Sequence, residues 1–224
     1  MTRQEYLDAI DIELKDTGSF LSTNDKSQAL DNAIQQYSKD RPRIRMVEFD
    51  GDGSSYDFQL PDDYIGSFSW IVMVEYPAGK QEPRIKREDR YAVYFKNDLY
   101  YLRMKYNVPS SSESLRVWYT TLHNEGTIPE TDTRLIVKLA TSYCFRMLAA
   151  KFAQSKDSII DADVVDYKSK VEQYTALADK LEAEYNRVIG RGDKGHPPAF
   201  AIKDWDRSLS EAMGHFLYHK PLYR

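Results

Sequence analysis

The chain is short of cysteine, because Cys144 is the only one among its 224 residues. A single thiol excludes an intrachain disulfide and any metal site that needs several thiolates. Cys144 lies in the apolar run TSYCFRMLAAKF, where a free cysteine usually packs as a small hydrophobic residue. The sequence therefore predicts a buried, unreactive Cys144 and a protein that suits a reducing compartment.

Long apolar runs are also missing. No stretch approaches the roughly 20 apolar residues that cross a bilayer, and the charged segment MTRQEYLDAIDIELKD has no apolar centre of a secretion signal. We therefore expect no contact with a membrane. With 42% hydrophobic and 29% charged residues, the composition is that of a folded domain. The net charge of −4 disfavours a dedicated nucleic-acid binder, which usually has a basic face.

Glycine-rich nucleotide motifs are absent too. The chain contains no GxxxxGK[ST], no GxGxxG after a strand and no GxSxG. The segment GRGDKG at 190–195 has neither a preceding strand nor a following helix, so we interpret it as a linker. We therefore expect no cofactor and no catalytic nucleophile.

Apolar residues at three- and four-residue spacing predict four helices. The expected ranges are about 2–16, 24–39, 132–154 and 162–189. Thr2 and Glu5 have the spacing of a capping box, and Ser22 or Thr23 can cap the second helix. The third helix is apolar on almost every side, which predicts a central position. The fourth keeps a 3.5-residue period, which predicts a long seam against another helix.

The part of the chain between residues 44 and 122 is rich in β-branched and aromatic residues, which favour strands. The six expected strands are IRMVEF, YDFQL, FSWIVMVEY, RYAVYF, LYYLRM and LRVWYTTL, with a short seventh at PRIK. The clearest hairpin is YAVYF-KND-LYYLRM. We predict an α+β fold in which a β sandwich or barrel is inserted into a four-helix bundle.

Three parts follow from this pattern. Residues 1–40 and 130–190 are expected to form the helical bundle, and 41–129 the β insertion. Residues 191–224 are expected to form an extended C-terminal arm, because they have little chance of a core of their own. The chain holds 17 tyrosines, which suit contacts between subunits or domains. We expect such contacts at the β insertion and at the tyrosine-bearing seam of the fourth helix.

The acidic stretch RMVEFDGDGSSYDFQLPDDY, residues 45–64, has one alternative as a calcium loop. An EF-hand counted from Asp50 would need Gly at its sixth position and Glu at its twelfth, but these are Ser55 and Pro61. We therefore predict a tight hairpin turn in which Gly51 and Gly53 supply positive φ angles.

A hydrolytic carboxylate pair is the second alternative for this stretch. Glu48 and Asp57 would face each other across the predicted hairpin, whereas the neighbours Asp62 and Asp63 would point to opposite faces of a strand. Glycosidase chemistry needs two carboxyls at a defined gap beside a sugar cleft, and the sequence shows no such cleft. We predict solvated turn carboxylates without a catalytic role.

A metal site in the last segment is a further alternative. His215 and His219 are four residues apart and can share one helix face, with His196 or Asp206 as a third ligand. The HExxH pattern is absent, so we predict surface histidines and no metal.

The basic cluster KDRPRIR at 39–45 has two readings, as a phosphate contact or as a salt-bridge surface for another protein. We favour the second, with Arg41 and Arg43 as partner-binding residues, because the neighbouring acids offset the positive charge.

The stretch from Ala29 to Pro77 resembles the head–tail connector, or adaptor, proteins of the tailed-bacteriophage neck. The resemblance lies in YSKDRPR closing a helix, the acidic turn after it, YDFQLPDDY, and IVMVEYP in the next strand. It covers about a quarter of the chain by motif, and the order of helices and strands extends it loosely to residue 190. At 224 residues the chain is long for a minimal adaptor, so the β insertion can also mark a different neck component.

The resemblance implies a structural virion protein without enzymatic activity. Such adaptors form a ring, often of twelve copies, that docks on the portal protein and presents a surface to the tail or to a lower neck protein. Genome DNA passes through the channel of the ring without specific binding. The resemblance also implies a place at the head–tail interface of the virion, for a protein made in the host cytoplasm.

C-terminal arms in such rings reach onto the portal or a neighbouring subunit. Aromatic and aliphatic residues in the last segment are the candidate anchors for such an arm. These are Trp205, Phe216, Leu217, Tyr218 and Tyr223. The alternatives are a tail terminator or gatekeeper of the same virion, a carboxylate-dependent hydrolase, and a nucleic-acid binder that uses KDRPRIR.

Overall fold

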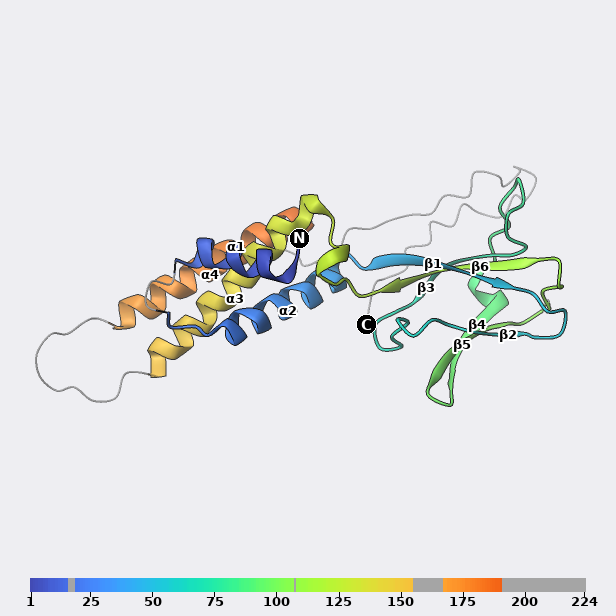
Figure 1. Ribbon diagram of the computed structural model, residues 1–224, viewed down its shortest axis with the longest axis horizontal. Coiled ribbons are helices and arrows are strands. Elements are labelled where there is room, and N and C mark those ends of the chain that lie inside the picture. The colour runs from blue at the N-terminus through green and yellow to red at the C-terminus, as the bar shows by residue number, and fades with distance from the viewer. Residues whose placement is uncertain (16–18, 107, 155–166, 191–224) are drawn as a thin grey trace, which may run out of the picture.

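The computed structural model describes residues 1–15, 19–106, 108–154 and 167–190. Helices gather at one end of an elongated molecule and strands at the other (Figure 1). The α+β class is confirmed, with two helices before the strands and two after them. The helices are α1 Arg3–Leu14, α2 Thr23–Asp40, α3 Thr133–Gln154 and α4 Tyr167–Ile189. The strands are β1 Arg43–Asp50, β2 Asp57–Gln59, β3 Ile71–Glu75, β4 Tyr91–Lys96, β5 Leu99–Met104 and β6 Ser114–Thr121.

The first two helices begin where their capping residues stand. The Thr2 hydroxyl accepts a hydrogen bond from the Glu5 backbone N–H, and the Glu5 carboxylate accepts one from the Thr2 backbone N–H. Ser22 and Asp25 form the same reciprocal pair at the start of α2. Both boxes satisfy backbone donors that a helix start leaves unpaired. The capping box predicted for the first helix is therefore confirmed.

Helix α3 is the centre of the helical unit and packs against α1, α2 and α4, as its uniform apolar character predicts. Cys144 is fully buried in this core. The predicted seam of α4 lies against α3, where the ring of Tyr174 stacks on Phe145 and Phe152 at centroid distances of 5.9 and 5.6 Å. Within the described part of the chain, no helix has the length and apolarity that crossing a bilayer requires.

The strands form two antiparallel sheets of three strands each, ordered β1–β6–β3 and β2–β5–β4. The predicted hairpin is confirmed as β4 and β5, joined by Asn97 and Asp98 with φ angles of 50° and 62°. Two left-handed residues in a two-residue turn match the twist of the strands. The predicted seventh strand at PRIK is reduced to one isolated bridge between Ile85 and Glu75.

One buried apolar cluster lies between the two sheets. Alternate residues of each strand point into it, as the two-residue period of a strand requires. Leu115, Val117 and Tyr119 of β6 supply the first sheet, and Phe58 and Leu102 supply the second. This core is separate from the helical one.

The prediction that the acidic stretch is a hairpin turn is wrong. Strand β1 pairs with β6 and β2 pairs with β5, so the chain crosses from one sheet to the other between Asp50 and Asp57. Glu48 and Asp57 therefore do not face each other across a hairpin; they pair with Arg116 and Arg103, respectively. The Asp52 carboxylate accepts hydrogen bonds from the Ser54 and Ser55 backbone N–H groups, which closes a local turn.

Glycine is required at position 51 because a side chain would collide with neighbouring backbone. Of the two glycines in this turn, Gly53 has the positive φ and Gly51 does not. The Gly51 N–H donates to the Glu113 carbonyl at 2.9 Å, which holds the crossing against the loop before β6. A Cβ atom at Gly51 would lie 2.2 Å from the Ser110 carbonyl oxygen. The contact is with backbone, which cannot move aside as a side chain does.

We expect Gly51→Ala to lower the free energy of unfolding by about 2 kcal/mol, the usual cost of forcing an extra carbon into a packed site. Urea unfolding followed by tryptophan fluorescence measures it. Gly126→Ala is the matched control, because its Cβ would meet only ordinary contact at 3.7 Å from the Asn124 side chain. Equal stabilities of the two variants would contradict the steric role of Gly51.

Candidate functional site

The first candidate region is the junction where the helical unit meets the strands. Helix α2 runs almost directly into β1, and β6 leads back to α3 through two short 3₁₀ turns, Glu125–Thr127 and Glu130–Asp132. Pro42 stops α2, since proline disfavours helical geometry in the residue before it. The chain therefore leaves and re-enters the helical unit through two adjacent strands.

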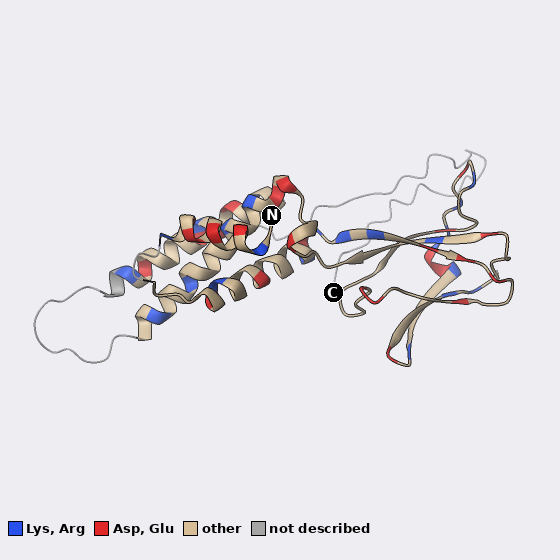
Figure 2. Ribbon diagram, in the orientation of Figure 1, with Lys and Arg blue, Asp and Glu red and all other residues tan. Residues whose placement is uncertain are grey.

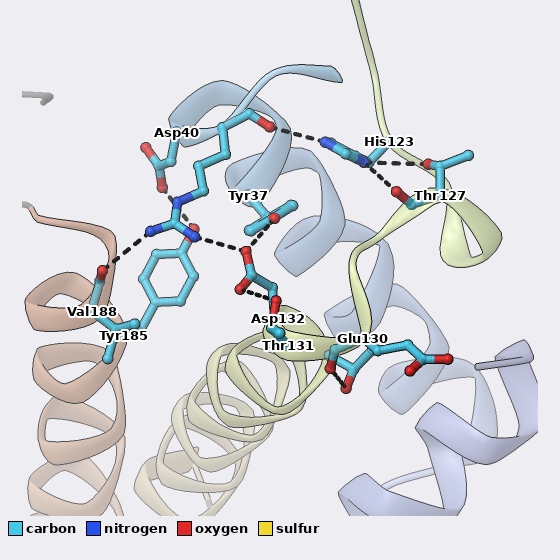
Figure 3. A network of polar contacts seen from close by, with 11 residues as sticks. Tyr37, Asp40, His123, Thr127, Glu130, Thr131, Asp132, Tyr185 and Val188 are labelled. Carbon is cyan, nitrogen blue, oxygen red and sulfur yellow. Dashed lines mark hydrogen bonds and ion pairs between the residues drawn. The ribbon is translucent and has the colours of Figure 1, made fainter. Parts of the chain in front are cut away.

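A single carboxylate connects the end of α2 with the start of α3 (Figure 3). Asp132 accepts hydrogen bonds from the Tyr37 hydroxyl at 2.6 Å, from the Arg41 guanidinium at 2.8 Å and from the Thr131 hydroxyl at 3.1 Å. Arg41 also donates to the Val188 carbonyl at the end of α4. One arginine therefore ties the ends of α2 and α4 to the start of α3.

Two more contacts reinforce the junction. The Tyr185 hydroxyl of α4 donates to Asp40 of α2 at 2.7 Å. The imidazole of His123 lies between two carbonyl oxygens, with Nδ1 3.1 Å from Thr127 and Nε2 3.0 Å from Arg41. The ring of His123 also contacts that of Tyr37 at a centroid distance of 5.1 Å. These contacts thus join α2, α4 and the segment that leads from β6 to α3.

Charge and burial act together on the ionisable groups here. Burial favours a protonated Asp132, but the hydrogen bonds from Tyr37, Arg41 and Thr131 outweigh it and lower the pKa of that carboxyl. Burial and the bond to Asp132 raise the pKa of Tyr37 above its ordinary value. The carboxylate is therefore ionised at neutral pH and its hydrogen-bonding positions are already taken by protein groups.

His123 makes the junction sensitive to acid. Burial lowers the pKa of its imidazole, helped by the charge of Arg43 and opposed by the two carbonyls and by Asp132. The unfolded chain then binds a proton more readily than the folded one between the lowered pKa and about 6.5, so stability rises with pH in that window. We expect the free energy of unfolding of the wild type to fall as the pH is lowered from about 7.5 to about 5.

In His123→Gln, part of this fall should disappear, because glutamine does not titrate. Urea unfolding of both proteins across the same pH range measures it. A variant whose stability falls as much as that of the wild type would show that His123 does not titrate with folding.

Residues Tyr37, Arg41, Pro42, Arg43, Ile44, His123, Pro129, Thr131 and Asp132 line a shallow hollow at the junction. The carboxylate of Asp132 and the imidazole of His123 are the groups here that could take part in acid–base chemistry. Both are bound by neighbouring protein groups, and their geometry fits a structural joint. In the ranges that the structure describes, no group of three or more His, Cys, Asp or Glu side chains is placed to hold a metal ion.

The second candidate region is the outer face of the sheet β1–β6–β3. Met46 is the direct partner of Trp118 on β6, and Trp118 is the direct partner of Met73 on β3. Paired residues of an antiparallel sheet point to the same face. The three side chains therefore form one apolar row across the sheet. Ile44 extends the row along β1, and it and Met46 are 57% and 48% exposed.

A charged row borders this apolar face. Arg116 of β6 forms ion pairs with Glu48 of β1 at 3.0 Å and with Glu75 of β3 at 3.2 Å. An apolar centre with a polar border is the usual arrangement of a protein–protein interface. We call Ile44, Met46, Met73 and Trp118 the outer apolar face.

The edge of the same sheet is open at β1. In the described ranges, β1 has β6 on one side and no strand on the other. An eight-residue edge strand presents unpaired backbone donors and acceptors, which natural proteins usually cover or block. The open edge and the outer apolar face lie on the same strand.

The residues predicted from the sequence to bind a partner lie in different parts of the chain. Arg41 lies in the internal network of the junction, whereas Arg43 lies on β1, partly exposed, beside the hollow. Their role in partner binding stays a prediction. The arm residues Trp205, Phe216, Leu217, Tyr218 and Tyr223, and the histidine set His196, Asp206, His215 and His219, lie outside the described residues.

Two tyrosines of α4, Tyr174 and Tyr185, pack within the helical unit, whereas the sequence suggested an outward contact surface. Tyr174 packs on α3, and Tyr185 is buried with its hydroxyl on Asp40. The outer apolar face was missed instead. The sequence signal for this face lies in β6, where buried and less buried residues alternate along LRVWYTT. Trp118 falls on the same, outward-facing set of positions as Arg116. Contiguous apolar residues on the solvent face of a sheet, unlike single ones, mark an interaction surface.

Comparison with known proteins finds only a distant structural similarity. No family model matches the chain, and no curated protein matches it. Among solved structures, a chain from the neck of a native GTA particle computed with C12 symmetry is 12% identical to this one. The match covers 75% of this chain and 89% of that chain with a TM-score of 0.28. At that TM-score the similarity is distant.

Proposed function

We propose that the chain is a structural subunit of a phage neck, a head–tail connector that forms a ring on the portal protein. The observation that carries this proposal is the outer apolar face, with Trp118 at its centre, beside the open edge of β1. Both features are costly for an isolated soluble protein and are expected where another subunit covers them. The sequence resemblance to connector proteins, which runs through α2, β1 and β3, supports the choice of a phage neck.

A ring also needs a second, different contact surface on each subunit, because its interfaces are heterologous. The β4–β5 hairpin is the candidate. It projects from the strands in Figure 1, and Phe95 near its tip is 57% exposed and contacts Tyr100 at a centroid distance of 4.9 Å. We propose that the hairpin of one copy contacts the outer apolar face of the next.

The remaining parts of the proposal follow from this role. The ring extends the DNA channel of the portal and offers a surface to the tail or to a lower neck protein. The protein acts at the head–tail interface of the virion and has no enzymatic activity, in keeping with acid–base groups at the junction that are held by structural contacts.

Native mass spectrometry of the full chain, alone and mixed with the portal protein, tests the proposal. We expect a complex of many copies of this chain on the portal ring in the mixed sample. A chain that stays monomeric and ignores the portal would contradict it. Binding to the tail-tube protein and not to the portal would instead identify a tail terminator or gatekeeper.

A further inference from the structure

A group of basic residues outside the predicted cluster lies between β3 and β5. Arg84, Lys86, Arg87 and Arg90 follow one another in the connection from β3 to β4. Backbone hydrogen bonds hold this segment against the strands, from Lys86 to Val74 and from Lys105 to Arg90 at 2.7 and 2.9 Å. The second of these places Lys105 of the β5 end beside Arg90.

These cations are close enough to repel one another. Burial lowers the pKa of Lys86, and the positive charges of Arg84 and Arg90 lower it further. Lys86 is partly buried, and the side chains of Arg84, Arg87, Arg90 and Lys105 are exposed. We call Arg84, Lys86, Arg87, Arg90 and Lys105 the basic patch.

Nearby acids neutralise only part of the basic patch. Asp89 lies 3.8 Å from Arg90, and Glu88 stands next to it in the same short 3₁₀ turn. The segment from Arg84 to Arg90 therefore holds four cations and two acids, and Glu113 lies near enough to Lys86 to oppose the lowering of its pKa. Figure 2 shows the acidic and basic residues mixed over the rest of the molecule.

The predicted basic cluster KDRPRIR differs from the basic patch in how many of its charges are paired with acids of the same chain. Arg41 is paired with Asp132, and Arg45 is paired with Asp63 at 2.6 Å, so the fold uses two of its four charges internally. Between residues that the structure describes, the closest ion pair of the basic patch is the long one from Arg90 to Asp89. The capacity to bind an anionic partner therefore lies mainly at 84–90 and Lys105.

Aromatic rings accompany the cations. The Arg90 guanidinium lies over the ring of Tyr106 at 4.7 Å from its centroid, and the Lys86 ammonium lies 5.2 Å from that of Tyr76. Tyr106 is 64% exposed. A cation held over an exposed aromatic ring keeps a fixed position and leaves its charge available to an anion.

We propose that the basic patch binds the phosphate backbone of duplex DNA without reading its sequence. A row of phosphates matches closely spaced cations and needs no shaped pocket. An acidic protein surface is the competing partner. A protein interface is expected to carry a larger apolar centre, and in this molecule that centre is on the outer apolar face instead. The inference goes beyond the connector role and does not depend on it, because each single chain carries the patch.

Fluorescence anisotropy of a labelled duplex of about 20 base pairs tests the proposal with the full-length chain across a range of salt concentrations. We expect binding at low salt, with an apparent affinity that falls steeply as salt increases. The variant Arg84→Gln/Lys86→Gln/Arg87→Gln should make the plot of log affinity against log salt shallower by about 2 to 3, since each phosphate contact contributes about 0.9.

The matched control is Arg134→Gln/Lys180→Gln/Arg187→Gln, which removes the same charge from exposed positions of the helical unit. Its salt slope should equal that of the wild type. The proposal is overturned if the wild type does not bind the duplex at low salt, or if both triple variants weaken binding equally. It is also overturned if poly-glutamate binds the patch as tightly as DNA does, which would identify an acidic protein as the partner.

Discussion

Trp118→Glu is expected to prevent assembly of the chain into a ring while leaving the single subunit folded. Trp118 is the centre of the outer apolar face, between its direct partners Met46 and Met73. Central tryptophans of interfaces typically contribute 2 kcal/mol or more each. We therefore expect dissociation at each contact to become easier by at least about 30-fold. The effect repeats at every interface of a ring, so assembly should fail completely.

The measurement is native mass spectrometry with the portal protein, together with circular dichroism to verify the fold. Tyr56→Glu is the control, because Tyr56 is 46% exposed on the same unit and lies in the crossing between β1 and β2. It should assemble as the wild type does. A Trp118→Glu protein that still forms the complex would rule out the outer apolar face as a subunit contact.

Asp132→Ala is expected to lower the free energy of unfolding by about 2 to 3 kcal/mol. The change leaves the buried Tyr37 hydroxyl without its acceptor and Arg41 without its counter-charge. Losing one member of a buried ion pair commonly costs 3–5 kcal/mol, and the value here is smaller because the Arg41 side chain is 41% exposed. Urea unfolding provides the measurement.

Two comparisons make this result specific. Asp132→Asn keeps an oxygen acceptor for Tyr37 and should lose only about 1 kcal/mol. Asp62→Ala removes an exposed carboxylate from the β unit and should stay within about 0.5 kcal/mol of the wild type. If Asp132→Ala were as stable as Asp62→Ala, the junction would not depend on this carboxylate.

At acidic pH, the Asp132 carboxylate should no longer contribute to the free energy of unfolding. Its pKa is lowered in the folded protein, so the contribution of the carboxylate is complete above the unfolded pKa and is lost as the pH falls through the folded one. The difference between the wild type and Asp132→Asn should therefore shrink below about pH 4.

Features with local signals were predictable from the sequence. Thr2 and Glu5 mark the start of α1 by their spacing alone, and Asn97–Asp98 between two aromatic runs marks the β4–β5 hairpin. Each signal lies within a few residues of the structure that it specifies. The central position of α3 was predictable for a related reason, since a helix that is apolar all round has to be buried.

Features that depend on distant pairing were not predictable in the same way. Strands adjacent in the sequence usually pair, so the sequence predicts a hairpin between the strands that flank the acidic stretch. In the structure, β1 pairs with β6 about seventy residues later, and Gly51 is fixed by the backbone at Ser110. The outer apolar face also comes from three strands. Its row of Met46, Trp118 and Met73 exists only once the registers of both pairs are known.

The pairing of Arg43 with Thr121 brings the two ends of the β unit together. These residues are direct partners at the two ends of the inserted strands, so their Cα atoms lie only about 5 Å apart. The junction residues Tyr37, Arg41, His123 and Asp132 all lie outside this span. A short turn could therefore replace the entire β unit while leaving the joint intact. The helical unit is therefore expected to fold without the β unit.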